Sequence, residues 1–200
     1  LFRSPMFLTG PPFYCRRRTR FSLCILLLLI IGGVEVNPGP SSSVNLTFGS
    51  LNTRSVVNKA PLLHSLIADN DLSLLALTET WVKSDDPPVI KNDPAPPGYR
   101  IVHVHRENPD QTRGGGLAII HREAINVSSR NHDFVHTSFE LQLVNIGLKS
   151  RDIVLANIYR PPSSSKSVFF EEFGLLLTNL GTDAVDRLII CGDFNLPGTS

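Results

Sequence analysis

The sequence predicts a sheet-rich α/β sandwich. Many short apolar runs have the length and patterning of β-strands, whereas only two longer segments have the residue spacing of amphipathic helices. With so few helices between so many strands, the elements cannot alternate strictly, as they do in a fully parallel sheet. The chain has 200 residues, of which 42% are hydrophobic, and this is enough to bury one good core. We therefore expect one domain in which helices cover packed sheets.

The expected strands are either continuously apolar or alternate apolar and polar residues, as buried and half-buried strands do. They cover residues 44–51, 72–77, 99–105, 117–121, 134–148 (as one or two strands), 153–158 and 188–191. A turn is expected at residues 113–116 (Arg-Gly-Gly-Gly), before the fourth of these strands, and its glycines 114–116 are expected to form a flexible entry to a hairpin.

Two helices and one loop complete the expected elements. Residues 59–70 repeat leucine and isoleucine on one helical face, and residues 166–180 are expected to do the same with Phe169, Phe170, Phe173 and Leu176. The proline-rich stretch 85–98 is expected to be a loop.

Four of the expected strands end in polar side chains that can do chemistry. They are Asn52, Glu79, Tyr159 with Arg160, and Asp193 with Asn195. In layered α/β proteins chemistry concentrates where rigid strands pass into loops. If these strand ends converge, the side chains form one polar cluster. Glu140, between Phe139 and Leu141, could face the same cluster, and Trp81 is expected in the core.

Each of these residues also has a purely structural interpretation. Asp193 and Asn195 alone would be a common turn that closes a strand. Glu79 alone could be a solvated edge residue, and Tyr159 could pack over the following prolines. The cluster, rather than any single residue, therefore carries the functional hypothesis.

Charge is distributed unevenly along the chain. Residues 1–40 hold five Arg and one Glu, and the remainder holds 14 basic and 17 acidic residues, so the globular part is slightly acidic. Bulk charge therefore does not support non-specific nucleic-acid binding, which would need a local basic patch. The cysteines Cys15, Cys24 and Cys191 contain no Cys-x-x-Cys pair, which argues against a disulfide framework or a zinc site.

The first forty residues form a leader. A basic cluster at 16–20 precedes the apolar run 21–31, which is shorter than the ~20 residues that a membrane-spanning helix needs, so no stable membrane span is expected. The pattern fits a signal peptide, although no small-residue cleavage site follows directly.

The leader ends in a distinctive motif. Residues 34–40 close with Asn37-Pro38-Gly39-Pro40 and resemble the end of 2A-type ribosome-skipping peptides. The resemblance implies that the bond between Gly39 and Pro40 is not made, although Gly33 stands where that family usually has Asp. The alternative is a Pro/Gly linker. We expect a spacer at 41–43 and a domain at 44–200.

Five short segments, in order, resemble the endonuclease/exonuclease/phosphatase superfamily, and more narrowly the apurinic-type endonuclease domain of non-LTR (LINE-type) retrotransposons. They are 50–55 (SLNTRS), 77–81 (LTETW), 113–119 (RGGGLAI), 157–162 (NIYRPP) and 192–195 (GDFN). The resemblance implies a DNase I-like four-layer α/β sandwich with two packed sheets, here with its C-terminal part missing. The chain begins at Leu1 rather than Met, and we expect a fragment at both ends.

The resemblance also implies a metal-dependent phosphodiesterase site. Glu79 resembles the metal-binding glutamate, and Asn52 the asparagine that helps to hold the Mg²⁺ (or Mn²⁺) or the scissile phosphate. Asp193 resembles the aspartate that orients and deprotonates the attacking water.

The remaining residues carried over by the resemblance would contact the phosphate. Asn195 is expected to hydrogen-bond it and to fix Asp193, and the Tyr159 hydroxyl is expected to contact it as charge develops. Arg54 and Arg160 are expected to bind the substrate, since guanidinium groups suit phosphates.

The implied function is to nick target DNA and free a 3′-hydroxyl for reverse transcription. DNA is then the expected partner, a reverse transcriptase region is expected downstream in the same reading frame, and nuclear access is expected, while the leader leaves secretion open. The family's terminal Asp–His motif would lie beyond Ser200. His103 and His105 are expected to be surface or packing residues. The alternatives are a phosphatase or phosphodiesterase of the same fold that acts on lipid or inositol phosphates, and a catalytically dead fragment.

Overall fold

The computed structural model describes residues 46–105, 114–148, 152–181 and 187–196. The leader with Gly39 and Pro40 and the spacer lie outside the described residues. No helix in the described part of the chain is long and apolar enough to cross a membrane.

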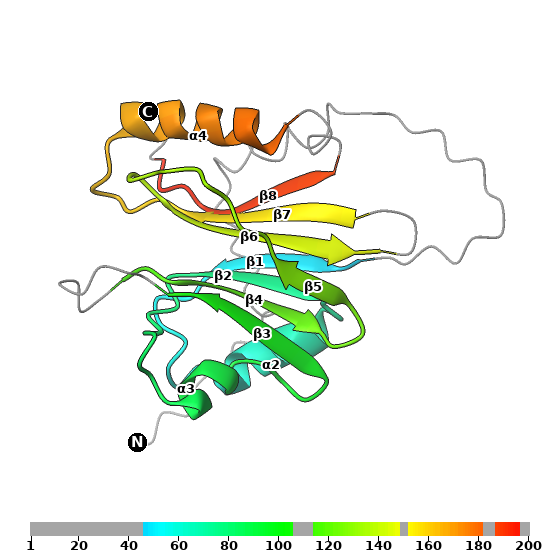
Figure 1. Cartoon of the computed structure of the whole chain (residues 1–200). Helices are drawn as coiled ribbons and strands as arrows, with labels where there is room; N and C mark the ends of the chain where they lie inside the picture. The colour runs from blue at the N-terminus through cyan, green and yellow to red at the C-terminus, as the bar shows by residue number, and fades with distance from the viewer. Residues whose placement is uncertain (1–45, 106–113, 149–151, 182–186, 197–200) are drawn as a thin grey trace, which may run out of the picture. The chain divides into compact units, whose positions relative to one another are not determined.

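Two four-stranded mixed sheets form the centre of the domain (Figure 1). Sheet A has the strand order β1-β2-β4-β3, and sheet B the order β5-β6-β7-β8. The strands are β1 (Phe48–Asn52), β2 (Leu74–Thr78), β3 (Tyr99–Val104), β4 (Leu117–Arg122), β5 (Asn126–Ser129), β6 (Glu140–Gly147), β7 (Asp152–Tyr159) and β8 (Leu188–Asp193).

Three apolar clusters hold four layers together. The first lies between helix α2 (Ala60–Asp69) and the outer face of sheet A, and the second between the two sheets. The third lies between sheet B and helix α4 (Lys166–Leu180), which covers that sheet in Figure 1. Strand β2 is buried on both faces because its alternate residues point into the first two clusters. The expected four-layer α/β sandwich is confirmed.

Two strand–helix–strand units bring the functional strand ends together. Strands β1 and β2 are parallel and joined through α2, and β7 and β8 are parallel and joined through α4. Parallel neighbours end at the same edge of a sheet, so Asn52 lies opposite Thr78, next to Glu79, and Tyr159 lies opposite Asp193. Each sheet therefore presents a pair of strand ends on one side of the domain.

A buried asparagine links the two sheets just below these ends. The Asn157 side chain, fully buried on β7, donates through Nδ2 to the Leu77 carbonyl on β2 at 3.0 Å. A weaker contact of 3.4 Å joins the same nitrogen to Gln142 Oε1. A buried amide needs such partners, and here the partners belong to both sheets, which fixes how the sheets align.

The elements differ from expectation in two places. The stretch 85–98, expected to be a loop, contains the short helix α3 (Pro88–Asn92), because proline is tolerated in the first helical turn, where its missing N–H is not needed. Strand β5 was not predicted, since it is polar and pairs only with β6 at the sheet edge. Within 134–148, where one or two strands are expected, the structure has one, β6.

The packing face of α4 also needs a correction. Phe169 and Leu176 are buried as expected, and Phe173 packs against the same cluster. Phe170, however, is 56% exposed, because it follows Phe169 directly and one residue turns a helix by about 100°.

Candidate active site

The four strand ends meet around the side chain of Asn52. Its Nδ2 donates to Glu79 Oε1 at 2.9 Å and to Asp193 Oδ2 at 2.6 Å. Glu79 follows β2 of sheet A, whereas Asp193 ends β8 of sheet B. One amide group thus bridges two carboxylates across the space between the sheets, and the structure brings the expected cluster together.

The amide oxygen of Asn52 orients the group. Oδ1 accepts a hydrogen bond from the backbone N–H of Arg54 at 3.1 Å. Because the oxygen faces this N–H, both amide hydrogens are directed at the carboxylates. Arg54 itself is exposed at the rim, so its guanidinium remains accessible to a phosphate.

Glu79 is held in a strained backbone conformation. Its φ is 54°, in the left-handed region that non-glycine residues rarely adopt. The Glu79 carbonyl accepts from the N–H of Ser55 at 2.7 Å and from Thr53 Oγ1 at 3.0 Å. Such strain costs about 1–3 kcal/mol and persists only where neighbouring contacts hold it, which is common at functional sites.

The hydroxyl of Tyr159 faces the carboxylates. Burial raises the pKa of Tyr159, and the neighbouring Glu79 carboxylate, to which the hydroxyl is hydrogen-bonded, raises it further. Glu140 and Asp193 act in the same direction. The phenol therefore stays protonated at neutral pH and can serve as a hydrogen-bond donor.

Asp193 is fixed by the loop that follows it. Its Oδ1 accepts from the backbone N–H of Asn195 at 3.0 Å, so the expected support of Asp193 by Asn195 comes from the main chain. The Asn195 side chain instead donates through Nδ2 to the Arg160 carbonyl at 2.7 Å.

Arg160 does not fit the substrate-binding role expected of it. The residue is only 2% exposed, and its Nη1 donates to the carbonyl of Asn195 at 2.9 Å. Its Nη2 donates to the carbonyl of Ser164. The guanidinium thus supports the loop after β8 from inside the protein and does not face the open site.

The glycine turn also differs from expectation. Instead of a flexible entry to a hairpin, Gly115 and Gly116 are docked on the segment after β2: the Gly115 carbonyl accepts from the N–H of Trp81 at 3.0 Å, and the Gly116 carbonyl from that of Thr80 at 3.1 Å. Glu140 accepts through Oε2 from the N–H of Gly116 at 2.6 Å. The glycine run was visible in the sequence, but its partners were not.

The donor types at the site fit a hard divalent cation. Among the described residues, no three His, Cys, Asp or Glu side chains gather into a metal cage. Mg²⁺ does not require one, since it usually binds one or two carboxylates and keeps waters and phosphate oxygens as its other ligands. The Glu79 carboxylate offers such a ligand, whereas the Asn52 amide turns its NH2 group to Glu79 and its oxygen to the Arg54 N–H.

His103 in β3 and His105 just after it take no part in this cluster. His103 Nε2 contacts the carbonyl of Lys91 at 2.8 Å, and His105 Nδ1 contacts that of Val82 at 3.1 Å. Burial lowers the pKa of His103. Both are packing residues, as expected.

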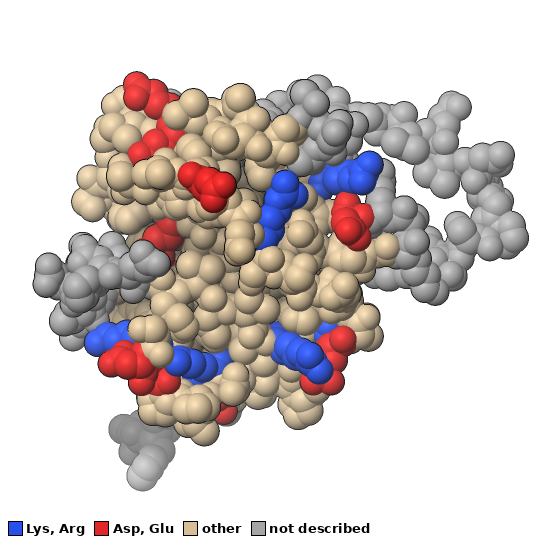
Figure 2. All heavy atoms as spheres, in the orientation of Figure 1, with Lys and Arg blue, Asp and Glu red and all other residues tan. Residues whose placement is uncertain are grey.

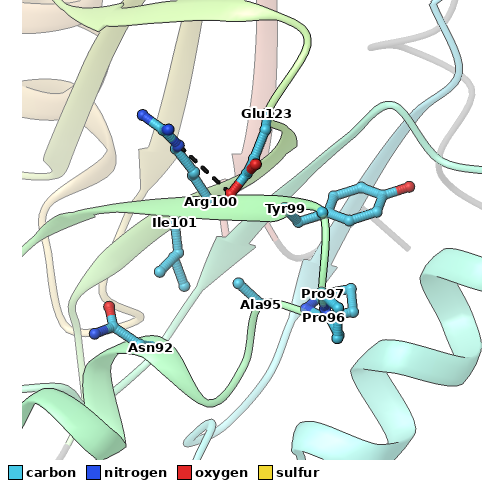
Figure 3. A pocket seen from close by; sticks show the side chains of 9 residues that line it. Asn92, Ala95, Pro96, Pro97, Tyr99, Arg100, Ile101 and Glu123 are labelled. Atoms are coloured by element: carbon cyan, nitrogen blue, oxygen red, sulfur yellow. Dashed lines mark ion pairs between the residues drawn. The ribbon is translucent and has the colours of Figure 1, made fainter.

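A cavity of about 560 Å³ lies elsewhere, lined by the start of β3 and by the segment before it (Figure 3). Tyr99 begins β3 and pairs with Arg122 at the end of β4, whereas the start of β4 pairs with Thr78 beside the site. The cavity is therefore at the opposite end of sheet A. In Figure 3 the exposed ion pair of Arg100 and Glu123, 3.7 Å apart, lies at its edge.

Comparison with solved structures supports the fold. The endonuclease domain of TRAS1, a telomere-specific non-LTR retrotransposon, shares 15% identity and a TM-score of 0.53, over 74% of this chain and 58% of that one. D. rerio TDP2 complexed with single-strand DNA product shares 14% identity with a TM-score of 0.51, and the match covers 76% of this chain and 62% of that one. A Bacteroides thetaiotaomicron protein of the endonuclease/exonuclease/phosphatase family shares 16% identity with a TM-score of 0.53, and the match covers 76% of this chain and 62% of that one.

The chain thus spans less than two thirds of each of these three structures. No match to a curated protein was found by sequence comparison. A family model, in contrast, matches residues 49–200, which include every strand end of the site. By this match, the chain belongs to the endonuclease/exonuclease/phosphatase family.

Proposed function

We propose that the chain is the catalytic part of a metal-dependent DNA endonuclease that nicks target DNA for retrotransposition. Hydrolysis of phosphoester bonds is the activity typical of the family. The observation that carries the proposal is the bridge from Asn52 to both Glu79 and Asp193, because it brings a candidate metal ligand and a candidate base together.

Each residue would have a separate task. Asp193 would orient a water and take its proton. Tyr159 would turn its hydroxyl from Glu79 to a phosphate oxygen. Asn195 would donate to the phosphate the amide hydrogen that is not bonded to the Arg160 carbonyl.

Glu79 would hold Mg²⁺ or Mn²⁺, and Asn52 would join it as a ligand once its amide turned the oxygen from the Arg54 N–H to the ion. The bound ion would polarise a phosphoryl oxygen. Arg54 would contact a neighbouring phosphate.

The choice of DNA rests on similarity and on the sequence motifs. Two of the similar structures are, by their names, a retrotransposon endonuclease and a protein bound to a DNA product. Figure 2 shows one face of the molecule, on which basic and acidic side chains lie in mixed groups. Residues 41–200 hold 14 basic and 17 acidic residues, so binding would depend on contacts at the site and not on bulk positive charge.

The leader belongs to the same proposal. Separation between Gly39 and Pro40 during translation would release the domain, and a reverse transcriptase region would follow it. A single unbroken product from in vitro translation would refute the skipping step.

A nicking assay tests the proposal. The protein translated from the entire reading frame should convert supercoiled plasmid into open circles with Mg²⁺ present, and EDTA should abolish the reaction. Release of phosphate from inositol phosphates or lipids, without any nicking, would overturn the proposal in favour of the alternative substrate class.

Glu79→Gln should weaken the metal dependence of the protein. Loss of a residue that only supports a metal ligand typically costs about 10- to 100-fold in affinity, so loss of the carboxylate itself should cost at least that. The measurement is the Mg²⁺ concentration at half-maximal nicking, together with the rise in melting temperature on adding Mn²⁺.

The matched control is Glu123→Gln, which changes an exposed carboxylate at the opposite end of sheet A. It should leave both readouts unchanged. An unchanged Mg²⁺ requirement in Glu79→Gln would remove Glu79 from the metal site.

A further inference from the structure

We propose that Glu140 is a positioning residue, whose carboxylate anchors the Gly114–Gly116 turn and thereby holds the strand end that presents Glu79. The proposal adds a residue to the site of the proposed function. Only its catalytic consequence rests on that function. It is carried by a chain of hydrogen bonds that runs from one sheet to the other.

The first step crosses between the sheets. Glu140 is the first residue of β6 in sheet B, and Gly116 directly precedes β4 in sheet A. The Glu140 Oε2 atom accepts the Gly116 N–H at 2.6 Å. Hydrogen bonds to a charged acceptor are stronger than neutral ones.

The second step runs from the turn to the end of β2. The carbonyls of Gly115 and Gly116 accept the N–H groups of Trp81 and Thr80 at 3.0 and 3.1 Å. The fit is close, because a Cβ on Gly116 would lie 2.6 Å from Thr80 Oγ1, and the φ of Gly116 is 83°. A displaced turn would therefore displace the segment after Glu79.

The third step concerns Glu79 itself. Its strained φ of 54° is held on one side by Thr53 and Ser55, which contact its carbonyl. The docked turn holds the following residue on the other side. Without the Glu140 anchor the second support weakens, and the segment can relax towards an unstrained conformation.

Trp81 provides a direct probe of this segment. It is the only tryptophan in the chain and is bonded to the anchored turn. Glu140→Ala should change the emission maximum of Trp81 and its quenching by acrylamide. Glu140→Gln should behave like the parent, because its amide oxygen can still accept the Gly116 N–H. The control Glu123→Ala, at the far end of the sheet, should have no effect.

Two fluorescence results would overturn the proposal. They are unchanged Trp81 emission in Glu140→Ala, and an equal change in the alanine and glutamine variants, which would assign the effect to charge and not to the anchor. If Glu140→Ala does not fold, amide hydrogen exchange of Gly116 in the parent decides: slow exchange supports the anchor, and rapid exchange overturns it.

The catalytic consequence is measured separately. Glu140→Ala should lower kcat for nicking about 10- to 100-fold with little change in KM, because small misplacement of a reacting group has effects of this size. Glu140→Gln should restore most of the rate. If the parent does not nick DNA, the proposed function fails, whereas the fluorescence result still decides whether Glu140 anchors the turn.

Discussion

Replacing Asp193 with alanine is expected to reduce plasmid nicking by about 10²–10⁴-fold, the range typical of a lost general base. The carboxylate is oriented from two sides, by Asn52 Nδ2 at 2.6 Å and by the N–H of Asn195 at 3.0 Å. These two hydrogen bonds fix the orientation of the carboxylate and leave one lone pair on each oxygen for a further partner. The loss should appear in kcat and not in KM, since Asp193 is not expected to bind the substrate in its ground state.

The appropriate control is Asp152→Ala. Asp152 is an exposed aspartate at the start of β7, the strand next to β8, and so lies at the opposite end of sheet B. It should leave nicking unchanged. Melting temperatures of both variants test whether unfolding causes the loss. Both variants should stay folded, because loss of one or two hydrogen bonds at a partly exposed site should cost only about 1–2 kcal/mol of stability. Undiminished nicking in Asp193→Ala would remove Asp193 from the reaction.

The strand ends could be predicted because local signals and topology agree. An apolar run that stops at a polar residue marks each end, and a helix between two such runs places both ends at one edge of a sheet. This applies to Asn52 with Glu79 and to Tyr159 with Asp193. The sheet-rich α/β sandwich followed from the same elements, whereas the four-layer arrangement was implied by the family resemblance.

The remaining features depend on contacts that sequence patterns do not encode. Arg160 next to Tyr159 suggested a phosphate contact, but three carbonyls of neighbouring loops surround its guanidinium. Glu140 looked like one polar residue among apolar neighbours, and only the distance to Gly116 shows its partner. Strand β5 lies at the exposed edge of sheet B, where polar side chains can face water, so its sequence carries no apolar signal. Each case is a long-range contact that overrides local patterning.

Gly192→Ala is expected to destabilise the domain by about 4 kcal/mol, because steric overlap and an unfavourable φ each cost about 1–3 kcal/mol. The φ of Gly192 is 123°, and a Cβ there would lie 1.9 Å from the carbonyl oxygen of Ile158. That oxygen belongs to the backbone of β7, which pairs with β8 at this position, so it cannot move aside as a flexible side chain could. Urea denaturation of the parent and variant measures the difference.

Gly174→Ala is the matched control, because it adds the same methyl group in open space. Nothing lies within 4 Å of a Cβ at Gly174, and the residue is in the interior of helix α4. There alanine should stabilise the protein by about 0.5–1 kcal/mol. A loss confined to Gly192→Ala would mean that close contact between β7 and β8 sets the position of Asp193 opposite Tyr159. Equal stability of the two variants would show that β8 can shift, and the geometry at Asp193 would then not depend on this glycine.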